Sequence, residues 1–226
     1  MKTNDKQPFY VCISGPFRIL SVTGSSVCSP GSTDAQQFKD GMQALVTDLN
    51  SDSNKCSNLS NYPLQVYSAS AELILQTWPL VIGGYNYELS GQGVKDIFVL
   101  KDSKWNRSGE LNHARAAAAS AMLNPSSILV SGGAHNKTKL DSTEIITFHS
   151  SGSLDQIKIG PKMPKASVGH CMVCISDHEV LFLGGKFGRE THIFNKWTSV
   201  WKQGPRMTES RYSFASGLLL TASGKR

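Results

Sequence analysis

The chain has 226 residues, of which 39% are hydrophobic and 18% are charged. This length and composition fit one large β domain or two small domains and exclude wholesale disorder. The formal net charge of +6 comes from scattered basic residues, which predicts a mildly basic surface and no nucleic-acid partner. No apolar run reaches the roughly eighteen residues that a membrane span needs, and the polar N-terminus is unlike a secretory signal.

The first 63 residues contain two strand patterns followed by a helical one. The runs 9–13 and 17–24 are joined by Gly15-Pro16, which indicates a hairpin. Residues 32–50 place apolar side chains on one face at helical spacing, which predicts a helix, and a polar linker follows. This N-terminal segment is a decayed repeat, the end of another domain or a capping element, and its sequence leaves the three alternatives open.

From residue 64 onward, three apolar runs each end in a pair of glycines, and the pairs are spaced by 49 and 52 residues. Each run fits a strand that is buried on both faces. A glycine pair at the end of such a strand fits a sharp turn with positive φ and a close approach of another main chain. The glycine pairs are Gly83-Gly84, Gly132-Gly133 and Gly184-Gly185.

A second set of features follows each glycine pair. In the first and third repeats, a tryptophan precedes an apolar residue by six positions, and Ile157 takes the tryptophan's place in the second repeat. A closing residue stands four positions after the apolar residue. We expect the tryptophans to be structural and to lie on outer strands, because one buried indole removes about 150–250 Å² from water. The tryptophans are Trp105 and Trp201, the apolar residues are Leu111, Met163 and Met207, and the closing residues are Arg115, Ser167 and Arg211.

This period of about 50 residues, with its glycine pair, later tryptophan and closing arginine, resembles the kelch repeat. The resemblance covers residues 64–226 and implies an all-β fold, an incomplete kelch-type β-propeller of about three blades and part of a fourth. Three blades cannot close a ring, so we expect either a piece of a longer protein or self-association of a complete chain. The predicted blades span 64–112, 113–164, 165–207 and, in part, 208–226.

For residues 114–123, the amino-acid composition and the position in the repeat predict different secondary structures. The segment is rich in alanine, the strongest helix former, so its composition alone favours a helix. The equivalent segments 168–175 and 212–220 have strand patterns, so the register predicts a strand instead. Small side chains would suit the crowded region near a propeller axis.

No residue pattern indicates a catalytic or metal site. Cys171 and Cys174 stand near His170 and His178, but on a strand His170 and Cys174 would lie about 13 Å apart, too far to hold one zinc ion. The chain has no GxSxG, P-loop, HExxH or GxGxxG sequence. We therefore predict that the protein is not an enzyme and has no cofactor.

Some kelch-like propellers are copper oxidases of the galactose oxidase type, and the resemblance keeps such an enzyme open as the least favoured alternative. Its chemistry uses a tyrosine linked to a cysteine, a second tyrosine and two histidines. Tyr85, Tyr87, Cys171 and Cys174 offer some of these residue types, but no motif assigns them to a copper site.

The family instead implies a protein-interaction module, either a substrate-recognition adaptor or a cytoskeletal binder, whose loops on one propeller face hold the partner. Arginines on that face suit an acidic peptide through paired hydrogen bonds, while a structural role at the ends of the blades is the alternative. The predicted partner is a protein, either an acidic peptide or a cytoskeletal protein. The candidate partner-binding residues are Tyr85, Arg115, His135, Arg189 and Arg211.

The cysteines and sequons leave the cellular compartment open, with the cytoplasm favoured over an extracellular location. Five cysteines at uneven spacing favour reduced thiols, while pairing of Cys12 with Cys28 or Cys56 stays open. The alternative function is an extracellular recognition module that carries N-linked glycans. The N-x-S/T sequons are at Asn58, Asn106 and Asn136.

Overall fold

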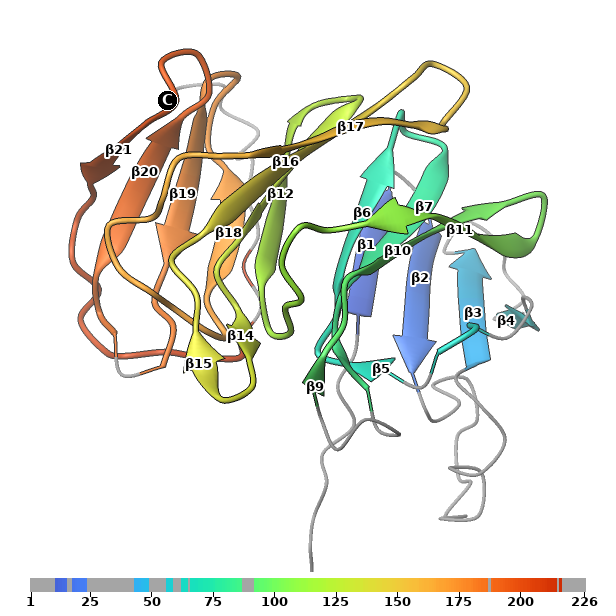
Figure 1. Ribbon diagram of the computed structural model, residues 1–226, viewed down its shortest axis with the longest axis horizontal. Coiled ribbons are helices and arrows are strands. Elements are labelled where there is room, and N and C mark those ends of the chain that lie inside the picture. The colour runs from blue at the N-terminus through green and yellow to red at the C-terminus, as the bar shows by residue number, and fades with distance from the viewer. Residues whose placement is uncertain are drawn as a thin grey trace, which may run out of the picture. The chain divides into compact units, whose positions relative to one another are not determined.

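The computed structural model describes residues 11–15, 18–23, 43–48, 56–58, 62–64, 66–86, 92–186, 188–214 and 216, with only the main chain in the first four ranges. Contacts divide the chain into two compact units, 1–116 and 117–226. Every regular element in the described ranges is a β-strand, so the predicted all-β class is confirmed there (Figure 1). Because these ranges contain no helix, they offer none that could cross a membrane.

The first unit begins with a four-stranded antiparallel sheet in the order β1-β2-β3-β4. The predicted hairpin is confirmed, because Gly15 of β1 pairs with Arg18 of β2 immediately after the turn. The strands of this first sheet are β1 (Val11–Gly15), β2 (Arg18–Thr23), β3 (Gln43–Asp48) and β4 (Cys56–Asn58).

The predicted helix over 32–50 is wrong for residues 43–48, which form β3. Leu45 pairs with Ser21 on one side and with Asn58 on the other, so β3 is hydrogen-bonded to a strand along both edges. Two ladders of main-chain hydrogen bonds outweigh a helical periodicity that depends on a few apolar positions. The rest of the predicted helix that precedes β3 lies outside the described residues.

The second sheet of the first unit has the order β6-β7-β10-β11 and is also antiparallel. A small three-stranded sheet, β5-β8-β9, lies beside the end of β7. The strands of the second sheet are β6 (Ser70–Ile74), β7 (Trp78–Ile82), β10 (Asp96–Lys101) and β11 (Lys104–Glu110). Those of the small sheet are β5 (Val66–Tyr67), β8 (Tyr85–Asn86) and β9 (Gln92–Gly93).

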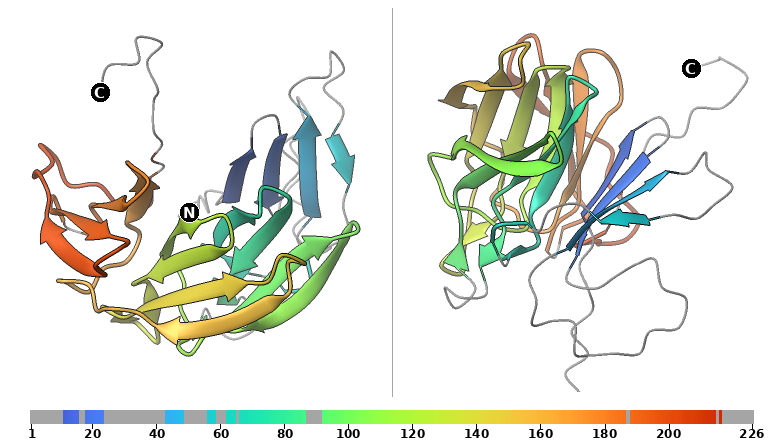
Figure 2. Two further views of the ribbon diagram at one scale, coloured as in Figure 1. Left: turned by 90° about the horizontal axis from the view of Figure 1, so that it is seen from above. Right: turned by 90° about the vertical axis from the view of Figure 1, so that its right-hand side faces the viewer.

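The second unit consists of two more sheets with the same meander, which are seen from above in Figure 2. The third sheet contains β12 (Ala119–Asn124), β13 (Ser127–Ser131), β16 (Thr143–Phe148) and β17 (Leu154–Ile159). Between β13 and β16, a hairpin is formed by β14 (Ala134–His135) and β15 (Thr138–Lys139). The fourth sheet contains β18 (Cys171–Cys174), β19 (Glu179–Leu183), β20 (Thr191–Asn195) and β21 (Val200–Gln203).

The strand predicted from the register for residues 114–123 is confirmed for 119–123, which lie in β12, whereas residues 114–118 precede this strand. Ala119 and Ala121 are buried there in the same cluster as Met172 of β18. The Cys174 thiol of β18 donates to the carbonyl of Met122 at 2.9 Å, so the first strands of the two sheets lie next to each other. The small side chains of Ala119 and Ala121 are buried in this packing, which overrides their helix propensity.

The apolar core of the first unit includes one face of the second sheet. Tyr62 contacts Phe98 and Trp105 edge to face, with ring centroids 5.2 and 5.0 Å away. Val66 and Val81 belong to the same buried cluster. Trp105 lies on the outer strand β11 with its ring buried, so it seals this cluster at the edge of the sheet.

The core of the second unit fills the space between the third and fourth sheets. Leu129 of β13 clusters there with Phe182 and Phe194 of the fourth sheet. Trp201 of the outer strand β21 packs on Phe194 with centroids 5.0 Å apart, and its Nε1 donates to the carbonyl of Pro161 at 3.3 Å. Because Pro161 follows the outer strand β17, this indole connects the outer edges of the two sheets.

Candidate interaction surface at the diglycine end

The three glycine pairs lie at the ends of β7, β13 and β19, and we call this end of each sheet the diglycine end. All six glycines have positive φ, from +56° to +110°, a region that strongly favours glycine. A Cβ atom on the first glycine of each pair would lie 2.4, 2.6 or 2.5 Å from the carbonyl oxygen of Arg115, Ser167 or Arg211. The turn and the close main-chain contact therefore both require glycine at this position.

The closing residues are the main-chain partners of the glycine pairs. The N–H of the second glycine donates to the closing carbonyl in all three sheets, and the closing position needs only its carbonyl for this bond. Ser167 can therefore replace the arginine of the other two repeats. The bonds join Gly84 to Arg115 at 3.0 Å, Gly133 to Ser167 at 2.8 Å and Gly185 to Arg211 at 2.9 Å.

Two further main-chain bonds recur in the three sheets. The N–H of the first glycine donates to the carbonyl of the residue at, or immediately before, the start of the sheet's third strand. The N–H of the apolar residue, four positions before the closing residue, donates to the carbonyl of the residue just before that acceptor. The diglycine ends thus share one framework, from which loops of different sequence extend. The acceptors for the first glycine are Asp96, Ser142 and Glu190, and the bonds of the apolar residues are Leu111 to Lys95, Met163 to Asp141 and Met207 to Arg189, each 2.8 Å long.

A third repeated position follows each closing residue by two places. Ala117, Gly169 and Ser213 all have positive φ, of 49°, 64° and 50°. In the second unit, the N–H of Gly169 donates to the carbonyl of Ala117 at 2.8 Å, and the N–H of Ser213 donates to the carbonyl of Gly169 at 2.7 Å. Sequence reasoning missed this position, because alanine, glycine and serine share only a small side chain, which does not indicate the main-chain conformation.

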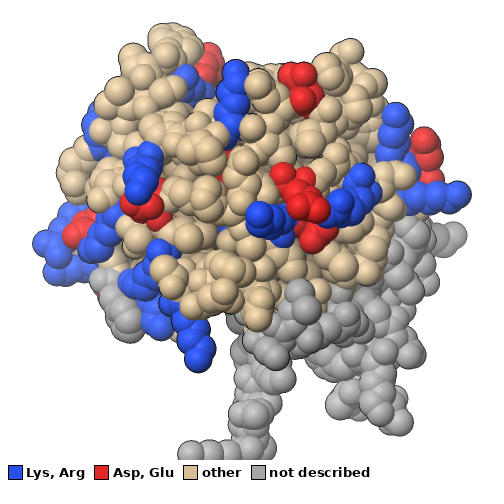
Figure 3. Space-filling view, in the orientation of Figure 1, with Lys and Arg blue, Asp and Glu red and all other residues tan. Residues whose placement is uncertain are grey.

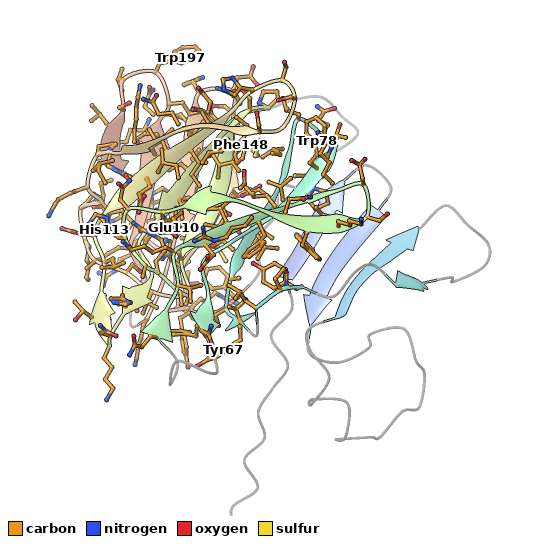
Figure 4. The ribbon with its side chains drawn as sticks, turned by 45° about the vertical axis from the view of Figure 1, so that its right-hand side comes forward. Tyr67, Trp78, Glu110, His113, Phe148 and Trp197 are labelled. Carbon is orange, nitrogen blue, oxygen red and sulfur yellow. The ribbon has the colours of Figure 1, made fainter. Side chains whose placement is uncertain are left out.

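In the first unit, the structure places Tyr85 at the diglycine end and Arg115 in the interior. Tyr85 is half-buried against Tyr67 with ring centroids 5.2 Å apart, and burial, with a smaller effect of Tyr67, raises the pKa of its hydroxyl. Figure 4 shows Tyr67 at this end and Trp78 at the opposite end of the unit. Arg115 is only 1% exposed, which favours the structural alternative over direct partner binding for this residue.

The second unit brings the other three candidates to its own diglycine end. His135 is half-buried in β14, in the loop that follows the second glycine pair. Arg189 is exposed and donates from Nη1 to the carbonyl of Thr208 at 3.2 Å. Arg211 is exposed beside Glu209, with Nη2 and Oε2 3.5 Å apart. The sequence pattern thus predicted correctly that these three residues lie at the same end of the unit. It did not predict which neighbouring residues their side chains contact.

The side chains considered for metal binding lie within the second unit. His170 is buried with its Nε2 2.8 Å from the Oγ of Ser131. The thiol of Cys171 donates to the carbonyl of Phe214, and burial raises its pKa. Among the described residues, no group of three His, Cys, Asp or Glu side chains could hold a metal ion. Tyr87, one of the two tyrosines considered for a copper site, lies outside the described residues.

Comparisons with known proteins agree with this architecture. No protein-family model matches the chain, and no curated protein matches its sequence. A fungal alcohol oxidase of the AA5 family in complex with copper is similar in structure, with a TM-score of 0.53 and 13% identity over 89% of this chain and 54% of the oxidase. The chain thus spans about half the length of that enzyme.

A second similar structure is that of YjhT, with a TM-score of 0.67 and 13% identity over 92% of this chain and 68% of YjhT. At this identity, the two likenesses concern the fold alone. They suggest that the four-stranded meanders of this chain belong to a kelch-like β-propeller fold.

Proposed function

We propose that this protein is a non-catalytic interaction module built on kelch-type propeller blades, and that a partner protein docks on the diglycine end. The glycine pairs, the closing residues and the packed tryptophans Trp105 and Trp201 supply the scaffold. The loops that follow the glycine pairs supply the contacts.

One observation carries the proposal. The same main-chain bonds recur at the diglycine end of three sheets, whereas the loops between those bonds differ in length and sequence. The first such loop supplies β8, with Tyr85, and β9 to the small sheet, the second forms the β14–β15 hairpin, and the third is a short connection with Arg189. A constant frame with variable loops is the usual arrangement of a recognition surface.

The test begins with a partner captured by the full chain and then purified. Its Kd is measured by calorimetry for the wild type, for Tyr85→Ala and His135→Ala, and for Trp197→Ala as a control at the opposite end of the second unit. We expect at least one diglycine-end variant to weaken binding about fivefold or more, with no change for the control. An affinity lost only in the control would contradict the proposal, provided that all variants keep the wild-type melting temperature.

Two other functions have an observation in their favour. The likeness to a copper alcohol oxidase supports an oxidase, which copper analysis and peroxide production would reveal in the purified chain. Asn106 and Asn136 are both exposed, which supports an extracellular glycosylated module, and loss of mass after glycosidase treatment would reveal it. Either result would replace the corresponding part of the proposal.

A further inference from the structure

The diglycine end of the second unit gathers basic residues that are scattered in the sequence. It consists of four loops, 132–142, 160–170, 184–190 and 204–211, which follow β13, β17, β19 and β21. The four loops contain eight lysines and arginines against three acidic residues, a formal net charge of +5 in a chain whose total is +6. All eight basic side chains are exposed: Lys137, Lys139, Lys162, Lys165, Lys186, Arg189, Arg206 and Arg211.

Contacts between the loops show that these charges form one surface. Lys165 of the second loop lies 2.7 Å from Glu190 of the third. The pKa of Glu190 is held below its ordinary value mainly by Lys165, and also by Arg206 of the fourth loop. The N–H of Lys186 donates to the carbonyl of Val168 at 3.0 Å, which fixes the third loop against the second.

The acidic residues neutralise only part of this surface. Glu190, Asp141 and Glu209 each lie close to one basic partner, at 2.7, 3.2 and 3.5 Å respectively. With eight basic and three acidic residues, the loops keep a large positive excess whichever way the pairs form. In the view of Figure 3, blue side chains project at the lower left of the molecule, where Figure 1 places the β14–β15 hairpin.

The opposite end of the same unit has no such excess. Its four turns, 125–126, 149–153, 175–178 and 196–199, contain one acidic residue, Asp177, and one lysine, Lys196. We call this the hairpin-turn end. A basic surface needed only for solubility would not have to collect on one end, so the asymmetry points to a ligand of opposite charge.

We propose that the diglycine end of the second unit binds an acidic segment of a partner protein. This inference rests on the proposed function and specifies the chemistry of the partner. The basic side chains extend from separate loops held on a rigid frame, so several carboxylates along an extended segment can be paired at once. The four loops contain one phenylalanine, Phe187, and no tyrosine or tryptophan, and the exposed Tyr212 follows the fourth loop. Single-stranded nucleic acid is held by repeated stacking on aromatic rings, for which these residues offer little.

Fluorescence anisotropy with the full chain tests this proposal. The probes are a labelled glutamate-rich peptide, a glutamine peptide and a lysine peptide of equal length, and a short DNA duplex. We expect the glutamate peptide to bind, to bind more tightly than the duplex, and to weaken steeply as salt is raised. Tighter binding of the duplex, or equal binding of the glutamine peptide, would overturn the proposal.

Charge reversal locates the binding surface. The double variant Arg189→Glu with Arg206→Glu should raise the Kd for the glutamate peptide at least about tenfold. The matched control, Lys104→Glu with Lys158→Glu, reverses two exposed lysines outside the four loops and should change it less than about twofold. An equal rise of the Kd in the two double variants would show that the peptide does not bind at the diglycine end of the second unit.

The outcomes separate this inference from the proposed function. A captured partner that loses affinity with His135→Ala, but keeps it with the double arginine variant, would refute the acidic-segment proposal and leave the docking face in place. Melting temperatures equal to that of the wild type establish that each variant is folded.

Discussion

The two ends of the second unit are held together in different ways. At the diglycine end, main chain binds main chain between residues far apart in sequence, as between Gly133 and Ser167 at 2.8 Å. At the hairpin-turn end, the Oδ1 of Asn195 accepts the N–H groups of Trp197 and Thr198 at 3.0 and 2.9 Å. The N–H of Lys196 also donates to the carbonyl of His178 in the neighbouring turn at 2.7 Å. The diglycine end thus connects loops that lead into different sheets, whereas the other end combines bonds within a turn with bonds between turns of the same sheet.

The side chains at the two ends also differ in how deeply they are buried. At the hairpin-turn end, Trp197 is 76% exposed and stacks on His178, with ring centroids 4.6 Å apart. Figure 4 shows Trp197 and Phe148 at this end. At the diglycine end, Thr143 and Thr191 are buried, and each hydroxyl donates to the carbonyl of a proline, Pro161 or Pro205. Stability should therefore be more sensitive to substitution at the diglycine end.

The largest effect is expected at the first glycine of a pair. In Gly132→Ala, the new Cβ would lie 2.6 Å from the carbonyl oxygen of Ser167, at a φ of +56°. Left-handed strain and overpacking together should cost roughly 3–5 kcal/mol of unfolding free energy. Gly188→Ala is the control at the same end, since its nearest atom would be 3.4 Å away. Chemical denaturation measures the unfolding free energy of both variants. Equal losses would show that the close contact between Gly132 and Ser167 does not make substitution more costly.

Trp201 and Trp197 of the fourth sheet allow a packed ring to be compared with an exposed one. Trp201→Ala removes a half-buried ring that packs on Phe194 and Phe182, and should cost about 2–3 kcal/mol, less than a fully buried aromatic residue. Trp197→Ala removes an exposed ring at the hairpin-turn end and should cost less than about 0.5 kcal/mol. Thermal and denaturant unfolding give both values, and a larger cost at position 197 would mean that the exposed ring stabilises the fold more than the packed one.

A hydroxyl at the diglycine end is expected to have a smaller effect. The Oγ1 of Thr191 donates to the carbonyl of Pro205 at 2.6 Å, and the residue is 2% exposed. Thr191→Val keeps the shape and leaves that carbonyl without its donor, so we expect a loss of about 1–2 kcal/mol. Thr198→Val, on an exposed turn residue at the other end, should be close to neutral. A neutral Thr191→Val would mean that this bond adds nothing to stability.

The smallest expected effect is a dependence on pH from His192. Burial lowers the pKa of this imidazole below its ordinary value of 6.5, an effect that Glu190 opposes and Lys165 reinforces. The folded state therefore resists protonation, and its stability should be full above pH 6.5 and decline as the pH falls below it. His192→Gln should flatten that decline in denaturation curves. A decline that persists unchanged in His192→Gln would assign it to other groups.

Sequence reasoning succeeded where a local pattern reports a local requirement. The apolar runs before the glycine pairs are strands, and residues 119–124 are a strand although their composition favours a helix, because the repeat register places them beside another sheet. It was wrong for residues 43–48, where the helical spacing gave no sign of the two neighbouring strands that hold β3. Strand pairing is non-local, so a single segment does not reveal it.

The candidate site was predicted in part for the same reason. Position in the repeat pointed to Arg115 and Arg211 together, yet Arg115 is buried and Arg211 is exposed. What they share is a main-chain carbonyl that accepts the N–H of a glycine. Every residue has such a carbonyl, so the sequence does not reveal this role. The third repeated position, at Ala117, Gly169 and Ser213, is likewise defined by main-chain conformation alone.

The sequence by itself determined the period of the repeat, because positive φ and close main-chain contact allow only glycine, and that requirement is written at fixed spacing. Only the tertiary structure decided where the charges meet. Eight basic residues that look scattered along the chain come from four loops at one end of the second unit, since every second connection of an antiparallel meander returns to the same end.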